Sequence, residues 1–497
     1  MKLDPSQRPF HSSQTSDVSA AKLRHSPNLI SVTTIDKDGS RGFLHPADTK
    51  GRYTFWRRLV ALVLIAVYIL LPWIPVNGYP AVFLDVTNQR FHFVGLTLAT
   101  QDLWLGFFII TGLAFSLFYI TAFFGRVWCG WTCPYTVFLE HVYRRVERFI
   151  DGDSHERRKL DAAPWGAMKL TKRLVKHGIY IALSAVIAHV FLSYFVSLKQ
   201  LYIWMQGPPT QHLFAFGVIL FITGSLYFAF SWFREQFCII LCPYGRLQSA
   251  LTDDNTINVG YDRKRGEPRG KVTDPEAGSC INCNRCVQVC PTGIDIRNGL
   301  QLECIGCTAC IDACDDIMVK VGRPKGLIRY DSMQGLNGKK TQYIRPRTIL
   351  YSLLFAIGVG AFALGLQTLK PFRMATTRLP GAPYFVNDGT VRNQFQVRII
   401  NKRNEPARFT LSLGGDAPAA MNLQGTEGEV ELPALSETVK TIVLTLPQSE
   451  YKKPVKVSLK VHETREHGGV MERAMEFLGP DPRLQNDDYL SPENYLK

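Results

Sequence analysis

Two runs of closely spaced cysteines in the 497-residue chain have the residue type and the spacing that hold iron–sulfur clusters. The runs are Cys280-x2-Cys283-x2-Cys286-x3-Cys290-Pro291 and Cys304-x2-Cys307-x2-Cys310-x3-Cys314. In the bacterial ferredoxin spacing, three thiolates surround one cluster and the fourth reaches across to the other. We therefore predict two 4Fe–4S clusters. The first would be bound by Cys280, Cys283, Cys286 and Cys314, and the second by Cys304, Cys307, Cys310 and Cys290.

Other uses of these eight thiols agree less well with the spacing. Zinc sites use two Cys-x2-Cys pairs set well apart, not eight thiols in this phase. Disulfides are not expected on the reducing side of a membrane, where the topology below places these residues. A structural role without electron transfer stays open. One departure from the ferredoxin pattern is Asp315, which follows Cys314 where proline is usual.

The other four cysteines belong to a motif that occurs twice. Trp128-Cys129-Gly-Trp-Thr-Cys133-Pro134-Tyr135 is repeated as Phe237-Cys238-Ile-Ile-Leu-Cys242-Pro243-Tyr244. Each cysteine pair would share one face of a helix or lie at the break between two helices, with the proline opening the second. If the motifs converge, Cys129, Cys133, Cys238 and Cys242 could bind Cu(I) or a cluster, or act as a redox-active dithiol site. The alternative is that they are small apolar residues at helix ends.

Histidine and tryptophan add little chemistry. His189 lies inside an apolar stretch, where an ionisable side chain is a functional candidate. Haem between helices usually takes paired histidines, and no other apolar stretch contains one, so we expect a core histidine. We expect Trp128 and Trp131 to belong to a membrane-interface belt and not to a substrate clamp.

Five apolar stretches without Asp, Glu, Lys or Arg must position these cysteines. A membrane-spanning helix needs about 17–25 mainly apolar residues. The predicted spans are 59–76, 103–124, 178–196, 213–230 and 349–366. The first begins too late in the chain for a secretory signal peptide, so we expect an uncleaved helix. The repeated cysteine motif follows the second and the fourth spans.

The distribution of basic residues predicts the orientation of these spans. Residues 1–58, 125–177 and 231–348 contain 10, 11 and 17 Lys and Arg, whereas the 78–102 and 197–212 loops contain one each. The positive-inside rule therefore places the N-terminus, the 125–177 loop and the cysteine-rich segment in the cytoplasm. Five spans then place the C-terminal residues on the far side of a bacterial inner membrane, in the periplasm.

Composition excludes several classes of protein. With 46% apolar residues, the chain is not intrinsically disordered as a whole. The net charge of +15 comes from loops beside the membrane, where anionic lipid is a simpler partner than nucleic acid.

The remaining segments predict further domains. Residues 1–58 read as a polar tail with an interfacial anchor at its end, and residues 251–348 as a ferredoxin-like domain. Alternation at Phe395, Val397 and Ile399 favours strands, and further short strands follow. We predict a β-sandwich over residues 380–480.

The two Cys-x3-Cys-Pro-Tyr motifs, the double ferredoxin run ending Ile-Asp-Ala-Cys314-Asp-Asp and the strand-rich tail resemble the CcoG family, also called RdxA or FixG. These are accessory proteins of cbb-type cytochrome c oxidase. The resemblance implies an inner-membrane iron–sulfur protein with an immunoglobulin-like C-terminal domain. It also implies reduction of Cu(II) to Cu(I) during copper supply to the oxidase. By resemblance, Cys129, Cys133, Cys238 and Cys242 would carry the copper-linked chemistry.

Three functions follow from these observations. The first is an oxidoreductase that takes electrons from a cytoplasmic donor and reduces copper, with oxidase subunits or copper-handling proteins as partners. The second is an electron relay between the quinol pool and a partner reductase, as in the related membrane ferredoxins NapH and NosR. The third is a non-enzymatic assembly scaffold in which the clusters only stabilise the fold. The exported β domain favours the first over the second.

Overall fold

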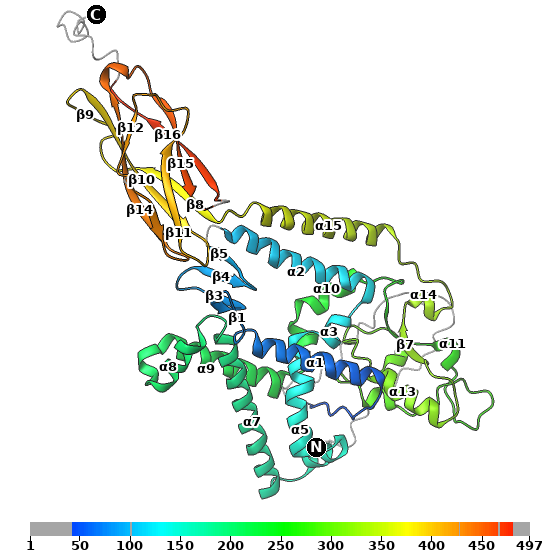
Figure 1. Ribbon diagram of the computed structural model, residues 1–497. Helices are drawn as coiled ribbons and strands as arrows, with labels where there is room; N and C mark the ends of the chain where they lie inside the picture. Colours follow the sequence, from blue (N-terminus) through cyan, green and yellow to red (C-terminus); the bar gives the residue numbers. More distant parts are fainter. Residues whose placement is uncertain (1–41, 100–101, 427, 466–467, 481–497) are drawn as a thin grey trace, which may run out of the picture. The chain divides into compact units, whose positions relative to one another are not determined.

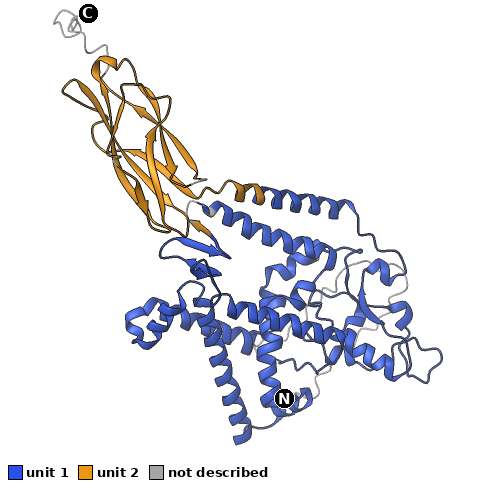
Figure 2. Cartoon of the chain, in the orientation of Figure 1, with its two compact units in different colours: residues 1–96, 100–362 blue, residues 97–99, 363–497 orange. Residues whose placement is uncertain are grey.

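The computed structural model describes residues 42–99, 102–426, 428–465 and 468–480. The chain divides into two compact units, residues 1–96 with 100–362 and residues 97–99 with 363–497 (Figure 2). Most of the predicted polar tail lies outside the described residues.

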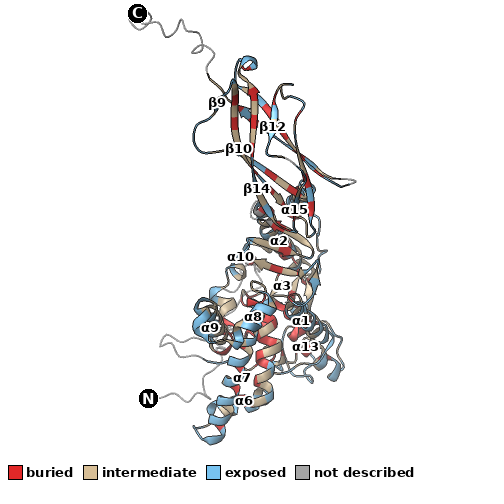
Figure 3. Ribbon diagram, turned by 60° about the vertical axis from the view of Figure 1, so that its left-hand side comes forward, coloured by how far each residue is buried: buried red, intermediate tan, exposed pale blue. Residues whose placement is uncertain are grey.

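Five long apolar helices dominate the first unit (Figure 1). They are α1 (Arg52–Leu70), α2 (Leu103–Phe124), α7 (Ala167–Leu192), α9 (Leu213–Phe228), which continues as the π-helix η4 (Ala229–Phe233), and α15 (Pro346–Gln367). At most 22% of the residues in any of these spans are buried within the protein. Large apolar side chains on these helices are exposed, such as Leu113 and Phe221. Figure 3 colours the exposed residues of the chain pale blue. Such helices are expected only in a membrane protein.

The first and third spans differ from their predicted bounds. The first helix ends at Leu70, and not at residue 76, because Pro72 cannot continue it. It begins at Arg52, so the predicted anchor residues form its first turns. The third helix starts at Ala167 and includes Lys169 and Lys176, both buried. The absence of charge therefore marks only the middle of a span.

Short elements connect the spans. Residues 71–99 form small strands, β1 (Pro75–Val76), β2 (Tyr79–Pro80), β3 (Val82–Asp85), β4 (Arg90–Phe93) and β5 (Leu96–Ala99). Between α2 and α7 lie α3 (Val127–Trp131), α4 (Pro134–Phe138), η2 (Leu139–Tyr143), α5 (Arg144–Asp151) and α6 (Ser154–Ala162). Between α7 and α9 lie α8 (Leu198–Gln206) and η3 (Pro209–His212).

The cysteine-rich segment is compact and has little regular structure. Its elements are η5 (Phe237–Leu241), α10 (Pro243–Leu251), β6 (Asn258–Tyr261), α11 (Arg263–Gly266), α12 (Arg285–Gln288), η6 (Ile296–Asn298), α13 (Ala309–Lys320), β7 (Ile328–Asp331) and α14 (Met333–Leu336). Antiparallel β6 and β7 pack with α13 around a core that contains Val259, Met318 and several of the cysteines. The sulfur side chains are therefore part of the core of this segment.

The second unit contains a β-sandwich. One sheet has the order β12-β14-β10-β8, with β9 paired to β10, and the other has the order β13-β11-β15-β16. The strands are β8 (Phe372–Arg378), β9 (Phe385–Asn387), β10 (Thr390–Asn401), β11 (Ala407–Leu413), β12 (Asn422–Gln424), β13 (Val430–Leu432), β14 (Glu437–Pro447), β15 (Val455–Glu463) and β16 (Val470–Phe477), with η7 (Gln448–Glu450) after β14. Alternate residues of β10, including Phe395, Val397 and Ile399, enter the shared core, as their spacing predicts.

Candidate functional site

The two ferredoxin-type runs have the same backbone turns. Asn282 and Gly306, at equivalent places in the runs, have φ of 56° and 65°. Asn284 and Thr308, two residues later, have φ of 54° and 62°. This left-handed region suits glycine and asparagine but is unusual for a β-branched residue such as Thr308. With these turns, the three closely spaced cysteines of each run line one cavity.

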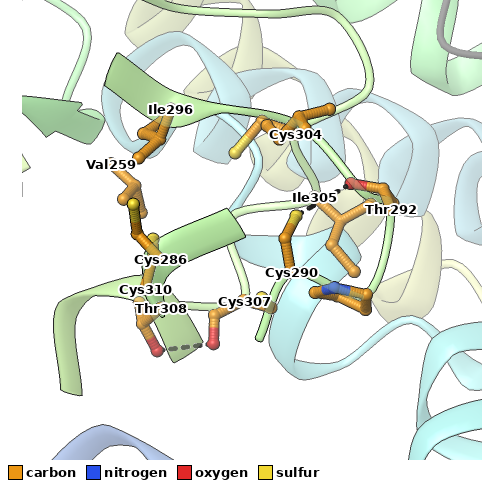
Figure 4. A pocket seen from close by; sticks show the side chains of 12 residues that line it. Val259, Cys286, Cys290, Thr292, Ile296, Cys304, Ile305, Cys307, Thr308 and Cys310 are labelled. Carbon is orange, nitrogen blue, oxygen red and sulfur yellow. Dashed lines mark hydrogen bonds between the residues drawn. The ribbon is translucent and has the colours of Figure 1, made fainter. Parts of the chain in front are cut away.

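The thiols gather around two cavities. The first is lined by Cys280, Cys283, Cys286 and Cys314. The second is lined by Cys290, Cys304, Cys307 and Cys310, with Cys286 also at its wall (Figure 4). The last cysteine of each run therefore reaches the cavity of the other run. These groups are the two ligand sets that we propose for the clusters.

The chemistry of both cavities fits iron–sulfur clusters. Besides cysteine, the second is lined mainly by apolar residues such as Val259 and Ile296. Burial raises the pKa of Cys304 to about 11 and that of Cys314 to about 12, so thiolates here need a cationic partner. In the described part of the chain, no three His, Cys, Asp or Glu side chains are placed to hold a single metal ion. A zinc ion needs ligands that converge on one point, whereas a 4Fe–4S cube binds each thiolate at a different iron. The spread of these cysteines therefore suits a cluster better than zinc.

Polar residues hold the loops of the first cavity. Arg297 Nη1 donates to Asn282 Oδ1 at 2.8 Å, and Arg297 Nη2 donates to Asn284 Oδ1 at 2.7 Å. The same guanidinium pairs with Asp295 at 2.6 Å. At the far end of the second run, Asp315 lies inside α13 and accepts a hydrogen bond from Gly326 N. A proline at that position would interrupt the helix, which explains the departure from the usual pattern.

The two Cys-x3-Cys-Pro motifs also share one backbone conformation. Gly125 and Arg234, which end their helices at equivalent positions, have φ/ψ of 53°/−121° and 46°/−126°. In both motifs, the N–H of the second cysteine donates to the carbonyl oxygen of the residue five positions before it, at a distance of 2.8 Å. The prolines then open α4 and α10. Each pair thus lies at a break between helices, one of the two predicted arrangements.

Contacts between the motifs bring their thiols together. The ring of Tyr135 stacks on Phe237 at 4.3 Å, and its hydroxyl donates to the Arg234 carbonyl at 2.6 Å. In return, the hydroxyl of Tyr244 is hydrogen-bonded to Thr121 in α2. Burial raises the pKa of Cys238, and negative charge on the other three thiols raises it further. The Cys238 thiol therefore lies close enough to the other three for their charges to act on it.

One of these thiols lies against the second ferredoxin-type cavity. A Cβ on Gly130 would lie 2.7 Å from the Ile305 carbonyl oxygen and 2.8 Å from that of Gly306. Cys129 packs in the same apolar cluster as Ile305 and Cys307. The backbone between Cys129 and Cys133 is therefore in direct contact with the loop that carries the second ligand set.

Arg126 reinforces this contact. Its Nη1 donates to the Cys304 carbonyl at 3.3 Å, and its Nη2 donates to the Gly245 carbonyl at 2.9 Å. Burial raises the pKa of Cys129 to about 12, while Arg126 and a hydrogen bond from Gln248 Nε2, 3.4 Å from the sulfur, act in the opposite direction. One guanidinium thus joins the first motif, the second motif and the ferredoxin-type segment.

Comparisons with known proteins identify the family. Residues 233–333 match the 4Fe–4S dicluster domain family, residues 105–151 a 4Fe–4S binding domain family, and residues 362–480 the immunoglobulin-like fold at the C-terminus of FixG. Protein RdxA of Cereibacter sphaeroides is 35% identical over 427 residues, covering 82% of this chain and 89% of RdxA. Nitrogen fixation protein FixG of Rhizobium meliloti is 34% identical over 464 residues, covering 81% and 86%. The chain belongs to the CcoG/RdxA/FixG family.

Membership of the CcoG/RdxA/FixG family confirms the coarse predictions. The chain is a membrane iron–sulfur protein of the electron-transfer type, with an immunoglobulin-like C-terminal domain. Ferredoxin-type protein NapH of Haemophilus influenzae is also similar, with 25% identity over 295 residues, 54% of this chain and 89% of NapH. The sidedness of the membrane helices stays a prediction.

Sequence reasoning missed a buried network of charges in this CcoG/RdxA/FixG protein. Glu147 of α5 contacts Arg234 at 3.0 Å, Lys176 at 3.5 Å and Arg157 at 3.7 Å, and all four side chains are almost fully buried. Arg144 pairs with Glu140 and Glu235 and donates to the Pro291 carbonyl at 3.2 Å. The signal was present, because Arg144, Glu147 and Asp151 recur at helical spacing.

Two expectations about single residues had different outcomes. His189 Nδ1 lies 2.7 Å from the Ala185 carbonyl of its own helix, which suits a core histidine. The interface belt expected for Trp131 stays a prediction, but this side chain also makes a contact that the sequence did not indicate. Its Nε1 donates to the Tyr330 hydroxyl at 3.1 Å, and that hydroxyl donates to the Gly306 carbonyl. Trp131 thus holds the first motif on the ferredoxin-type segment.

Proposed function

We propose that this protein accepts electrons from a cytoplasmic donor and reduces Cu(II) to Cu(I) for assembly of a cbb-type cytochrome c oxidase. When bound, 4Fe–4S clusters would supply one-electron redox chemistry, which matches the one-electron copper couple. The observation that carries the proposal is the close approach of Gly130 to Gly306. It joins the ferredoxin-type segment to the motifs that contain Cys129, Cys133, Cys238 and Cys242.

The residues around the four thiols suit a copper substrate. Thiolates hold Cu(I) in preference to Cu(II), so a thiolate that contacts copper here would favour its reduction. Cys129 and Cys238 lie just after the ends of α2 and η4, at the predicted cytoplasmic edge of the membrane. Copper-handling proteins or oxidase subunits would be the partners, with the C-terminal domain in the periplasm.

The test is anaerobic mixing of the reduced full-length protein with Cu(II), following Cu(I) formation and loss of the reduced iron–sulfur signal together. Both should proceed with equal stoichiometry. Replacing Cys129, Cys133, Cys238 and Cys242 with serine should abolish the reaction and leave the two ferredoxin-type signals. Thr132→Ser, in the same loop, is the matched control and should react normally. Iron–sulfur centres that stay reduced in the presence of Cu(II) contradict the proposal.

A relay between quinol and a partner reductase is the second candidate, favoured by the similarity to NapH over 54% of this chain. It predicts that a short-chain quinol reduces the oxidised iron–sulfur centres at a rate independent of copper. Cu(II) reduction without any response to quinol would select the first function.

A further inference from the structure

We infer that Cys129, Cys133, Cys238 and Cys242 together hold a third 4Fe–4S cluster, shared between the two halves of the repeat. This inference deepens the proposed function, on which its role rests, because it names the centre from which the electron leaves for Cu(II). Three features support it: the reciprocal packing of the two motifs, the number of thiols that a cluster takes, and the polar groups beside these thiols.

The first feature is the reciprocal packing of the two motifs. Tyr135, which follows the first cysteine pair, contacts Arg234 and Phe237 at the end of the fourth span. Tyr244, which follows the second pair, contacts Thr121 at the end of the second span. The two motifs therefore pack against each other reciprocally. Gln248 of α10, the helix that follows the second pair, also donates to Cys129 of the first pair, which places that thiol against the second motif.

The second feature is the number of thiols that a cluster takes. No three of these thiols are placed to hold a single metal ion, and the same is true of the eight ferredoxin-type cysteines and the rest of the described chain. The residues matched by the 4Fe–4S binding domain family, 105–151, contain only Cys129 and Cys133. A 4Fe–4S cluster takes four thiolates, so two must come from elsewhere. Cys238 and Cys242 are the thiols that the fold supplies.

The third feature is the environment of the thiols. Gln248 is fully buried, and its Nε2 donates to Cys129 Sγ at 3.4 Å. Hydrogen bonds to sulfur and nearby positive charge tune the reduction potential of such a centre. Arg126 supplies the charge. Hydrogen bonds to the Cys304 and Gly245 carbonyls hold its guanidinium in place. The site thus has an amide donor, a cation and, through Gly130, direct contact with the second ferredoxin-type loop.

The electron balance is simple. Oxidation of the third centre by one electron would convert one Cu(II) into one Cu(I), with no proton or bond exchanged. An external low-potential donor, dithionite in the test, restores the reduced state. Copper is then a substrate that is reduced beside the cluster, and these four thiols bind the cluster and not the copper ion.

The test measures iron and acid-labile sulfide in the full chain, purified without oxygen. We expect about twelve of each per chain for the wild type and about eight for the quadruple serine variant. Because the centre is shared, Cys129→Ser/Cys133→Ser and Cys238→Ser/Cys242→Ser should each lose as much iron as the quadruple variant. A wild type with about eight irons, or double variants that each lose only half as much, overturns the inference. Thr132→Ser should keep all the iron.

A second measurement covers variants that fail to fold. In a redox titration of the wild type followed by electron paramagnetic resonance, three components support the inference and two overturn it. Gln248→Leu should lower the potential of the third component and leave the other two unchanged. A third cluster without Cu(II) reduction defeats the proposed function alone. Cu(II) reduction by a protein with two clusters defeats this inference alone.

Discussion

At the scale of single residues, Arg297 is the side chain on which the first ferredoxin-type cavity depends most. It pairs with Asp295 and bonds both left-handed asparagines, Asn282 and Asn284. Removing one partner of a buried ion pair costs about 3–5 kcal/mol. We expect Arg297→Met to lose the first cluster, about a third of the iron if three clusters are present, and to retain the others. Iron analysis and electron paramagnetic resonance measure this, with the surface variant Arg269→Met as control. Full iron content in Arg297→Met would contradict it.

His141 makes stability depend on pH. Burial, reinforced by Arg57, lowers its pKa to about 4, against an unperturbed value of about 6.5. The unfolded chain therefore binds a proton in this range while the folded protein does not, so stability falls as pH decreases from about 6.5 to about 4. We expect the apparent Tm in detergent to fall across this window and His141→Asn to flatten the dependence. An unchanged slope in the variant would assign the pH dependence to other groups.

At the scale of elements, the buried charges join α5 to α7 and to the end of η4. Glu147 forms ion pairs with Arg234, Lys176 and Arg157. Loss of its negative charge therefore leaves three buried cations without this partner. Glu147→Gln should destabilise the protein by about 3–5 kcal/mol. Thermal unfolding in detergent measures this, and Glu276→Gln, at an exposed position, is the control. If the two variants unfold at the same temperature, the network contributes no net stability.

The contact between α3 and the second ferredoxin-type loop gives another prediction. A Cβ at Gly130 would meet backbone atoms of Ile305 and Gly306, which cannot rotate away. We expect Gly130→Ala to separate the two segments, slowing Cu(II) reduction with little change in iron content. Stopped-flow mixing with Cu(II) measures the rate. Gly112→Ala, in open space in α2, should react like the wild type. Equal rates for both variants would remove this contact from the electron route.

Sequence patterns predicted the helices and strands better than they predicted the contacts between them. The uncharged run 103–124 coincides with α2 because no charged partner interrupts it. The same rule misplaced the start of α1, since Arg57 lies inside the helix, buried, with Nε bonded to the Gly130 carbonyl. Cysteine spacing indicated which thiols gather around each cavity, because that grouping depends on local turns. The approach of Gly130 to Gly306 depends on tertiary packing, so no local sequence pattern predicts it.

At the scale of the whole molecule, the two compact units differ in what they contain. The first contains every cysteine, four complete spans and the fifth span as far as residue 362, and the second has its own core between two sheets. A domain with an independent core can be removed without exposing the core of the other. Electron transfer and partner recognition can therefore be separated by truncation.

Deleting residues 370–497, after the end of α15, should leave the iron content and Cu(II) reduction of the purified protein unchanged. The same deletion should impair assembly of the oxidase in cells, because the domain proposed to meet the partner is absent. Purified protein is assayed for the first outcome, and membranes of a deletion strain for oxidase activity in the second. Re-expression of the full chain is the control. Loss of Cu(II) reduction on truncation would mean that the sandwich contributes to the redox site, whereas normal oxidase assembly would leave it without the proposed recognition role.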